Sequence, residues 1–102
     1  MNPNHLSIAM HHFLLSFYHS LRECRGALYD FSIESNFYHG LGLITAALNL
    51  EAIEYKQHVC LAEMLINAAA LRREELISKQ PAHSRIALTA YQAKRAEKER
   101  AA

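Results

Sequence analysis

Apolar residues recur along the first third of the chain at intervals that alternate between four and three. The pattern holds for seven consecutive positions, namely Met10, Leu14, Phe17, Leu21, Cys24, Leu28 and Phe31. An α-helix turns once every 3.6 residues, so these positions form one line along a helix, as is typical of a helix packed against others. The spacing predicts a long first helix from about Asn4 to about Phe31.

A second set of apolar residues, Ile8, Leu15 and Tyr29, lies about 100° around this helix from the main line. Two interpretations remain open for this set. In the first, another helix of the chain or loose core packing covers these residues. In the second, a second copy of the chain or a different protein docks on them, helix against helix.

A turn is expected between Asp30 and Asn36. After it, the apolar pattern predicts two further helices. The second helix is expected from about Asn36 to Leu48, and its glycines allow a neighbouring helix to approach closely. A tight turn over residues 50–54 leads into the third helix, with Asn49 as the candidate left-handed residue. Because the connection is short, these two helices should form an antiparallel hairpin.

The character of the chain changes after Pro81. Few large apolar residues follow it, and residues 94–100 are charged apart from one alanine. Ser84 can cap a final helix whose outer half has nothing to bury. We therefore expect an all-α fold, a small bundle of three to four helices. Residues 1–80 would form the bundle core and residues 81–102 a basic C-terminal helix or tail, either packed on the same domain or projecting from it.

Composition narrows the class of protein further. A chain of 102 residues supports one domain, and a net charge of +1 gives no general attraction to nucleic acid or an anionic membrane. No stretch approaches the roughly 18 apolar residues that span a membrane, and no signal peptide is apparent. Cys24 and Cys60 both fall on apolar helix faces, which predicts two buried free thiols. We expect a cytoplasmic protein without a membrane partner.

Candidate sites for metals, cofactors and catalysis are weak. Seven histidines are present, but no two are three or four residues apart, the spacing that lets a helix hold one ion. The Gly40-Leu41-Gly42 segment lacks the third glycine of a dinucleotide loop. His58 and Cys60 would project from opposite sides of a helix. We expect no metal, no cofactor, no small-molecule substrate and no enzymatic activity.

The remaining features favour a protein interaction module, with another protein or a second copy of the chain as partner. It would be a small modulator or inhibitor of a larger partner, of the kind that phages and plasmids often carry. The expected contact residues are Ile8, Leu15, Tyr29 and Tyr91.

The alternative function is a nucleic-acid-binding regulator that uses the C-terminal helix. Residues 81–102 hold five basic and two acidic side chains, a net +3, whereas residues 30–75 hold three basic and seven acidic side chains, a net −4. A basic helix can lie along phosphates. The residues that would do so are Arg85, Lys94, Arg95, Lys98 and Arg100.

Overall fold

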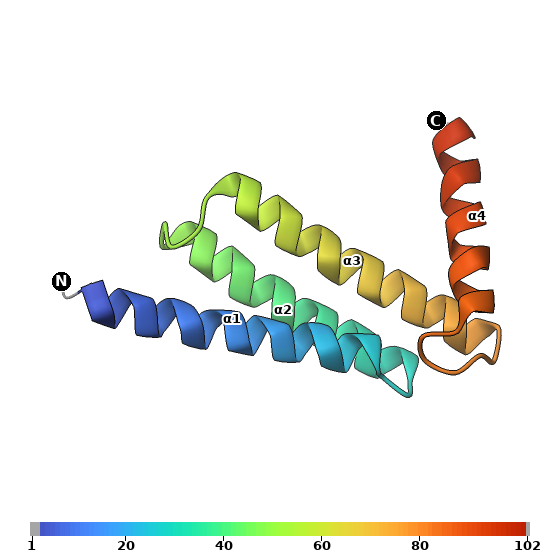
Figure 1. Cartoon of the computed structure of the whole chain (residues 1–102), viewed down its shortest axis with the longest axis horizontal. Coiled ribbons are helices and arrows are strands. Elements are labelled where there is room, and N and C mark those ends of the chain that lie inside the picture. The colour runs from blue at the N-terminus through green and yellow to red at the C-terminus, as the bar shows by residue number, and fades with distance from the viewer. Residues whose placement is uncertain (1–2, 102) are drawn as a thin grey trace.

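The chain folds into four helices joined by short connections (Figure 1). The structure, a computed structural model, describes residues 3–101, with side chains from residue 8 onward, and contains no strand within that range. Helix α1 spans Pro3–Arg25, α2 Asp30–Asn49, α3 Tyr55–Ile77 and α4 Arg85–Ala101. The expected all-α bundle is confirmed. Across the described helices, none is both long enough and apolar enough to cross a membrane.

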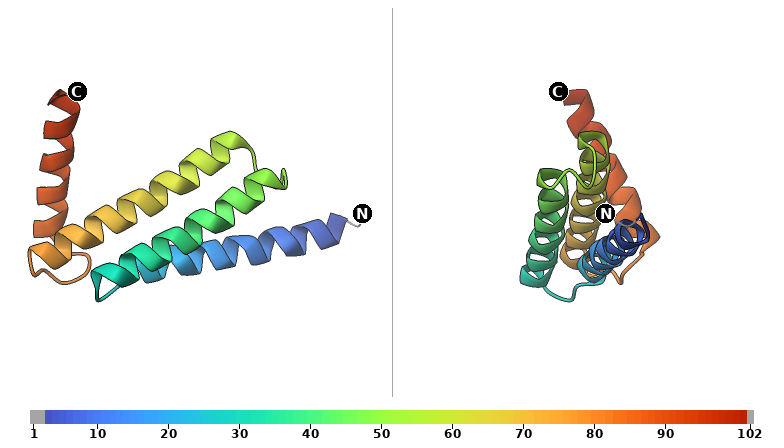
Figure 2. Two further views of the ribbon diagram at one scale, coloured as in Figure 1. Left: turned by 180° about the vertical axis from the view of Figure 1, so that it is seen from behind. Right: turned by 90° about the vertical axis from the view of Figure 1, so that its left-hand side faces the viewer.

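Helices α1, α2 and α3 lie side by side, each running opposite to the next, and α1 packs on both of the others (Figures 1 and 2). The expected antiparallel hairpin is therefore confirmed as α2 and α3. Helix α4 differs, because among the described helices it contacts only α3. It points steeply away from the other three helices, and its outer half projects beyond them (Figure 2).

Helix α1 ends at Arg25, so the expected continuous helix to Phe31 is wrong. Gly26 begins a turn, since glycine is among the weakest helix formers, and the chain reverses over residues 26–29. The last two positions of the apolar line, Leu28 and Phe31, are consequently 71% and 70% exposed. The single long helix predicted from the spacing is thus two antiparallel helices.

Helix α2 begins at Asp30, earlier than the expected start near Asn36. Tyr29 precedes it with an extended backbone (φ −134°, ψ 151°), and its carbonyl oxygen accepts hydrogen bonds from the N–H groups of Ser32 and Ile33 at 3.0 and 3.2 Å. The carboxylate of Asp30 lies in the first turn, where negative charge complements the helix dipole. The residues in which a turn was expected therefore form the start of a helix.

The expected turn between α2 and α3 is confirmed, although its left-handed residue is Glu51 (φ 60°) and not Asn49. Glu54 caps α3 from the other side of this turn. Its backbone N–H donates to Oε1 of Gln57 at 2.8 Å, and the backbone N–H of Gln57 donates to the Glu54 side chain in return. Such a reciprocal pair satisfies two of the free N–H groups at a helix start.

The core fills the space between α1, α2 and α3 in two adjoining clusters. Side chains from all three helices contribute, so no pair of helices could bury this surface alone. The first cluster holds Phe17, Ile44, Ala47, Ile53 and Leu65, and the second holds Cys24, Ala27, Ile33, Ala68 and Ala69.

The two cysteines have different environments. Cys24 is fully buried and its thiol donates to the carbonyl oxygen of Ile33 at 3.6 Å. Burial raises the pKa of this thiol, and the positive charges of Arg73 and Arg25 offset that rise only in part. Cys60 is exposed, so the expectation of two buried thiols is wrong for Cys60, which sits at the solvent edge of its apolar arc.

Thiol labelling of the folded protein should separate the two cysteines. We expect Ellman's reagent to modify Cys60 quickly and Cys24 only upon unfolding, since a buried thiol with a raised pKa is rarely ionised or accessible. The variant Cys60→Ser should lose the fast phase, and Cys24→Ser should keep it. Two fast phases in the wild-type chain would contradict the burial of Cys24.

Candidate protein interaction surfaces

Ile8 and Leu15 lie on the side of α1 that faces away from the bundle. They are seven residues apart, so their side chains point in nearly the same direction, about 10 Å from one another along the helix. Ile8 is 58% and Leu15 54% exposed, whereas Phe17, on the opposite side of α1, is 3% exposed. The interpretation that another helix of the chain covers Ile8 and Leu15 is therefore wrong.

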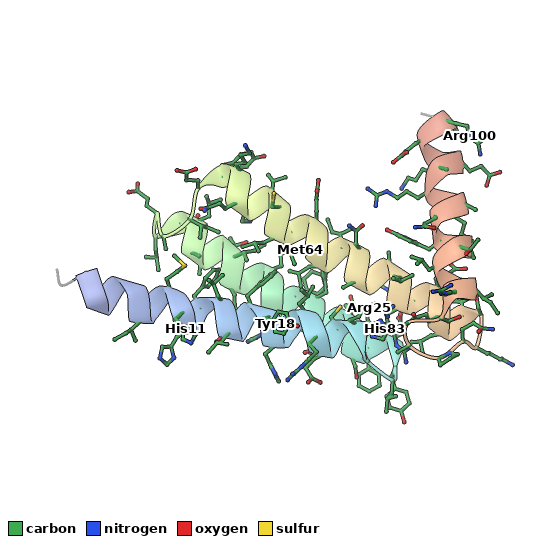
Figure 3. All side chains as sticks on the ribbon, in the orientation of Figure 1. His11, Tyr18, Arg25, Met64, His83 and Arg100 are labelled. Carbon is green, nitrogen blue, oxygen red and sulfur yellow. The ribbon has the colours of Figure 1, made fainter. Side chains whose placement is uncertain are left out.

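Polar side chains flank these two apolar residues. Figure 3 shows His11 directed away from α2 and α3. Among the side chains that the structure describes, from residue 8 onward, helical geometry places four polar ones within about 60° of the line through Ile8 and Leu15, and none is acidic: His11, His12, His19 and Arg22. All four are exposed. We call Ile8, Leu15 and these four residues the outer α1 face. It combines two apolar side chains with three imidazole side chains and one guanidinium.

Tyr29 lies in the turn between α1 and α2, at the other end of α1 from Ile8. Its ring is 59% exposed and stacks on the ring of Phe31, with centroids 5.5 Å apart and planes 5° from parallel. Leu28 beside them is exposed as well. The structure thus places Tyr29 in an apolar cluster at the turn, apart from Ile8 and Leu15.

Tyr91 is half-buried between α3 and α4. Its hydroxyl donates to Oδ1 of Asn67 on α3 at 3.0 Å, and Arg95 donates to the same oxygen at 3.3 Å. Tyr91 therefore helps to hold α4 on α3 and does not stand free on the surface. It lies on a different helix from Ile8 and Leu15, so the four expected contact residues do not form one site.

The five basic residues expected to contact nucleic acid are distributed around α4. By helical geometry Lys94, Arg95 and Lys98 share the side toward α3, whereas Arg85 and Arg100 lie roughly opposite. The ammonium group of Lys94 donates to both carboxylate oxygens of Glu74 on α3, at 3.0 and 2.7 Å. Arg95 lies 3.5 Å from the carboxylate of Glu99. These contacts neutralise part of the positive charge of α4. The structure does not gather the five residues on one face.

A groove of about 710 Å³ separates α3 from the outer half of α4. Its floor is apolar and holds Ile66, Ala70, Ile77 and Tyr91. Its α3 wall holds Glu63, Asn67, Arg73 and Glu74, and its α4 wall holds Lys94, Arg95, Lys98 and Glu99. We call this the α3–α4 groove. It exists because α4 departs steeply from α3 and no other described helix packs against α4.

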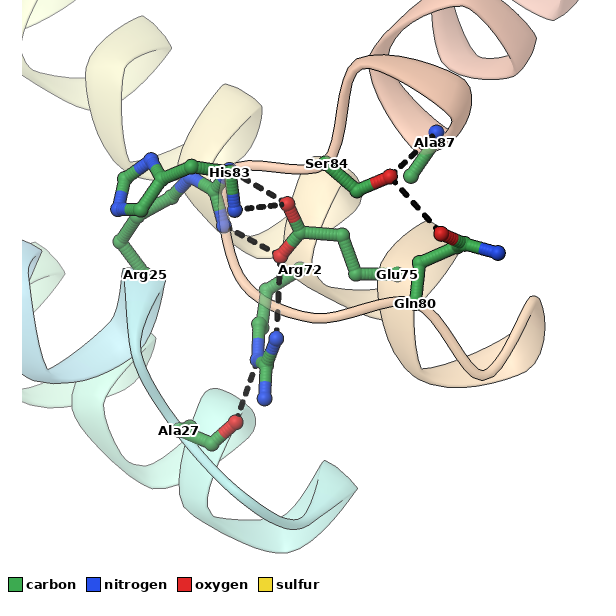
Figure 4. A network of polar contacts seen from close by, with 8 residues as sticks. All are labelled: Arg25, Ala27, Arg72, Glu75, Gln80, His83, Ser84 and Ala87. Atoms are coloured by element: carbon green, nitrogen blue, oxygen red, sulfur yellow. Dashed lines mark hydrogen bonds and ion pairs between the residues drawn. The ribbon is translucent and has the colours of Figure 1, made fainter.

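A buried ionic network lies where the C-terminal ends of α1 and α3 come together (Figure 4). The carboxylate of Glu75 is fully buried and accepts two hydrogen bonds from the guanidinium of Arg25, at 2.6 and 2.7 Å. Arg72 donates to it at 3.1 Å and the backbone N–H of His83 at 2.7 Å. Arg72 also donates to the carbonyl oxygen of Ala27 at 2.5 Å. One carboxylate thereby joins the α1–α2 turn, α3 and the α3–α4 loop.

The charges around Glu75 determine its ionisation. Burial by itself raises the pKa of the carboxyl group, but the hydrogen bonds from Arg25 and Arg72, the charge of Arg25 and the N–H of His83 outweigh it. The net result is a pKa lowered from 4.5 to about 2. Glu75 is therefore ionised at any physiological pH. Each of its two carboxylate oxygens accepts two hydrogen bonds from groups of the same chain. Its arrangement is that of a structural ion pair.

The sequence analysis missed this network, although a signal was present. Arg72 lies seven residues after Leu65, and Glu75 lies seven after Ala68, so both charges occupy the core-facing side of α3. Charged residues in that position need partners, because a buried unpaired charge is very costly. The partner Arg25 is 50 residues from Glu75 in sequence.

The other polar clusters do not indicate a metal site or a catalytic site within the described residues. In the part of the chain that the structure describes, no three His, Cys, Asp or Glu side chains come close enough to hold a metal ion. Ser20 Oγ and His39 Nδ1 are hydrogen-bonded at 2.6 Å. Ser20 is 1% exposed, which leaves a substrate no access to its hydroxyl, so this pair is best explained as a contact between α1 and α2.

Comparisons of the chain with protein-family models, with curated proteins and with solved structures give no match. Function is therefore inferred from the fold and its surfaces alone.

Proposed function

We propose that this chain is a non-enzymatic interaction module that binds a larger protein through the outer α1 face. The observation that supports the proposal is the exposure of Ile8 and Leu15, at 58% and 54%, on the side of α1 opposite the core. Apolar residues repeated along one exposed helix face are a usual means of seating a helix in a groove of another protein. Binding would modulate the partner by covering part of its surface.

The flanking residues indicate the chemistry of the partner. The outer α1 face holds three histidines and Arg22 and no carboxylate. Complementary potentials favour the correct partner and speed association. The partner surface should therefore be an apolar groove with acidic residues along its rim. Tyr29 with Phe31, at the α1–α2 turn, would supply a second contact if that groove is long enough.

Affinity capture with a matched pair of variants tests this proposal. Wild-type chain and the double variant Ile8→Glu/Leu15→Glu are used as baits in the same cell extract, and captured proteins are identified by mass spectrometry. We expect a partner that the wild type retains and the double variant loses by at least about tenfold, since two buried charges would face its apolar groove. Both changes are at exposed positions, so the helical content should not change.

The control is Ile86→Glu, at a 67% exposed position on α4 away from the outer α1 face. This variant should capture the partner as the wild type does. If the double variant and the wild type capture the same proteins equally, the outer α1 face is not the binding surface and the proposal is wrong.

The second candidate function, nucleic-acid binding through α4, has one observation in its favour. Arg85, Lys98 and Arg100 are exposed on a helix that projects from the bundle. The distribution of charge around α4 and the contacts of Lys94 and Arg95 weaken it. Titration of random-sequence DNA at low salt separates the two functions. Binding that weakens steeply as salt is added would support the nucleic-acid reading.

A further inference from the structure

The chain exposes more surface than a compact protein of its mass. Its accessible surface is 7422 Å², against about 5,800 Å² for a compact monomer of this size. Its radius of gyration is 15.8 Å, against about 13 Å for a compact domain of this length. Helix α4 contributes to the excess surface of roughly 1,600 Å², because it contacts α3 alone among the described helices.

Two large apolar side chains are exposed in the groove beside α4. Ile66 and Ile77, on the floor of the α3–α4 groove, are 52% and 75% exposed. Ile66 also lines a smaller depression between α2 and α3, together with Tyr38, which is 59% exposed. Scattered apolar residues are normal on a protein surface, but a contiguous patch indicates an interface.

The charges of the groove are arranged so that the surface complements itself. Glu63 lies on the α3 wall and Lys98 on the α4 wall, and within the described residues no salt bridge engages either of them. A two-fold axis brings each wall of one copy against the opposite wall of the other. The charged residues on the α3 wall (Glu63, Arg73 and Glu74) have a net charge of −1, and those on the α4 wall (Lys94, Arg95, Lys98 and Glu99) a net charge of +2, so the two walls are opposite in sign.

We propose that a second copy of this chain occupies the α3–α4 groove, with α4 of each copy packed against α3 of the other about a two-fold axis. A stable interface of standard size buries about 800 Å² on each partner, which is about half of the excess surface of roughly 1,600 Å². Ile66 and Ile77 form the apolar centre, and the charges of the two walls form its rim. This surface is separate from the outer α1 face, which stays exposed in the dimer.

Sedimentation equilibrium and light scattering of the purified chain over a range of concentrations test the proposal. We expect a mass twice the 11.6 kDa of the chain at micromolar concentration. The double variant Ile66→Glu/Ile77→Glu should be monomeric at the same concentration, with unchanged helical content because both positions are exposed. The matched control Leu15→Glu, on the outer α1 face, should remain a dimer.

Mixing two charge-reversed chains tests the arrangement within the dimer. Lys98→Glu alone and Glu63→Lys alone each place like charges on facing walls, so each should dimerise at least about fivefold more weakly than the wild type. In an equimolar mixture both contacts become opposite in sign again. The mixture should therefore form a heterodimer more readily than either variant forms a homodimer. A contact within one chain could not be restored by mixing.

Three results would overturn the inference. A wild-type chain that is monomeric at high micromolar concentration excludes the dimer. A dimer that persists in Ile66→Glu/Ile77→Glu but is lost in Leu15→Glu uses the outer α1 face. If the two charge variants, once mixed, show no preference for the heterodimer, then α3 of one copy does not face α4 of the other. The first and third results do not bear on partner capture, because that experiment depends on Ile8 and Leu15.

Discussion

Replacing Glu75 by Gln should lower the free energy of unfolding by about 3–5 kcal/mol. The change removes the negative charge that faces Arg25 and Arg72, and the Arg72 side chain is only 7% exposed. Its guanidinium would then be buried without a counter-charge, and the amide nitrogen of the new side chain would face donors. Urea unfolding followed by circular dichroism, at one fixed protein concentration, measures the loss.

The adjacent residue provides the control. Glu74 accepts hydrogen bonds from Lys94 at 3.0 and 2.7 Å, but the Lys94 side chain is 64% exposed and solvent screens the pair. Glu74→Gln should therefore cost less than about 1 kcal/mol. Equal losses for E74Q and E75Q would show that burial does not distinguish the two pairs, contrary to the account given for Glu75.

The pH dependence of stability should report the same carboxylate. The pKa of Glu75 is lowered from 4.5 to about 2 in the folded chain, so the unfolded chain binds a proton more readily than the folded one. The stabilisation is fully present above about pH 4.5 and is lost as the pH falls toward 2. Wild-type stability should decline over this interval, and the decline should be smaller in E75Q, which has no carboxylate at this position.

Replacing Gly40 by Val should destabilise the bundle by about 3 kcal/mol. A Cβ atom at this position would lie 2.9 Å from Cδ2 and 3.0 Å from Cδ1 of Leu65. The end of the Leu65 side chain has nowhere to move, because it is 0% exposed in the centre of the core. The β-branched side chain adds two further carbons at the same close contact between α2 and α3. Thermal and urea unfolding both measure this effect.

Gly42 offers a matched position two residues away on the same helix. A Cβ atom there meets nothing within 4 Å, and valine is a better helix former than glycine. Gly42→Val should therefore leave stability unchanged or raise it by a few tenths of a kcal/mol. If both variants lost the same amount of stability, the contact with Leu65 would not be the cause of the loss.

The sequence predicts the features of this fold that depend on neighbouring residues. Apolar spacing predicts helices and the antiparallel hairpin, and Ser84 caps α4 as expected, its hydroxyl oxygen accepting from the N–H of Ala87 at 3.4 Å. The sequence alone could not show that Gly40 and Gly42 have different environments. They differ because Leu65, on another helix, lies against Gly40 and not against Gly42. Spacing places Ile8 and Leu15 away from the main apolar line but leaves open whether another helix covers them, and the structure shows both exposed.

The end of the first helix depends on contacts that are distant in sequence. The apolar line continues through Leu28 and Phe31, so periodicity indicates an unbroken helix there. The turn at Gly26 is held by Arg72, which donates to the carbonyl of Ala27 from 45 residues away. Tyr91 was expected to contact a partner protein. Its hydrogen-bond acceptor, Asn67, belongs to another helix and could not be identified from the spacing of residues along α4. Spacing along one helix carries no information on such pairs.

The topology has a consequence for how quickly the native state is reached. Except for the packing of α1 on α3, every helix of the chain rests on the helix next to it in sequence. Chains dominated by such near neighbours fold in microseconds to milliseconds, because little loop entropy is lost before contacts form. The pairing of Arg25 with Glu75 spans 50 residues. We expect it to form late in folding and to break early in unfolding, because two reversals of the chain lie between the two residues.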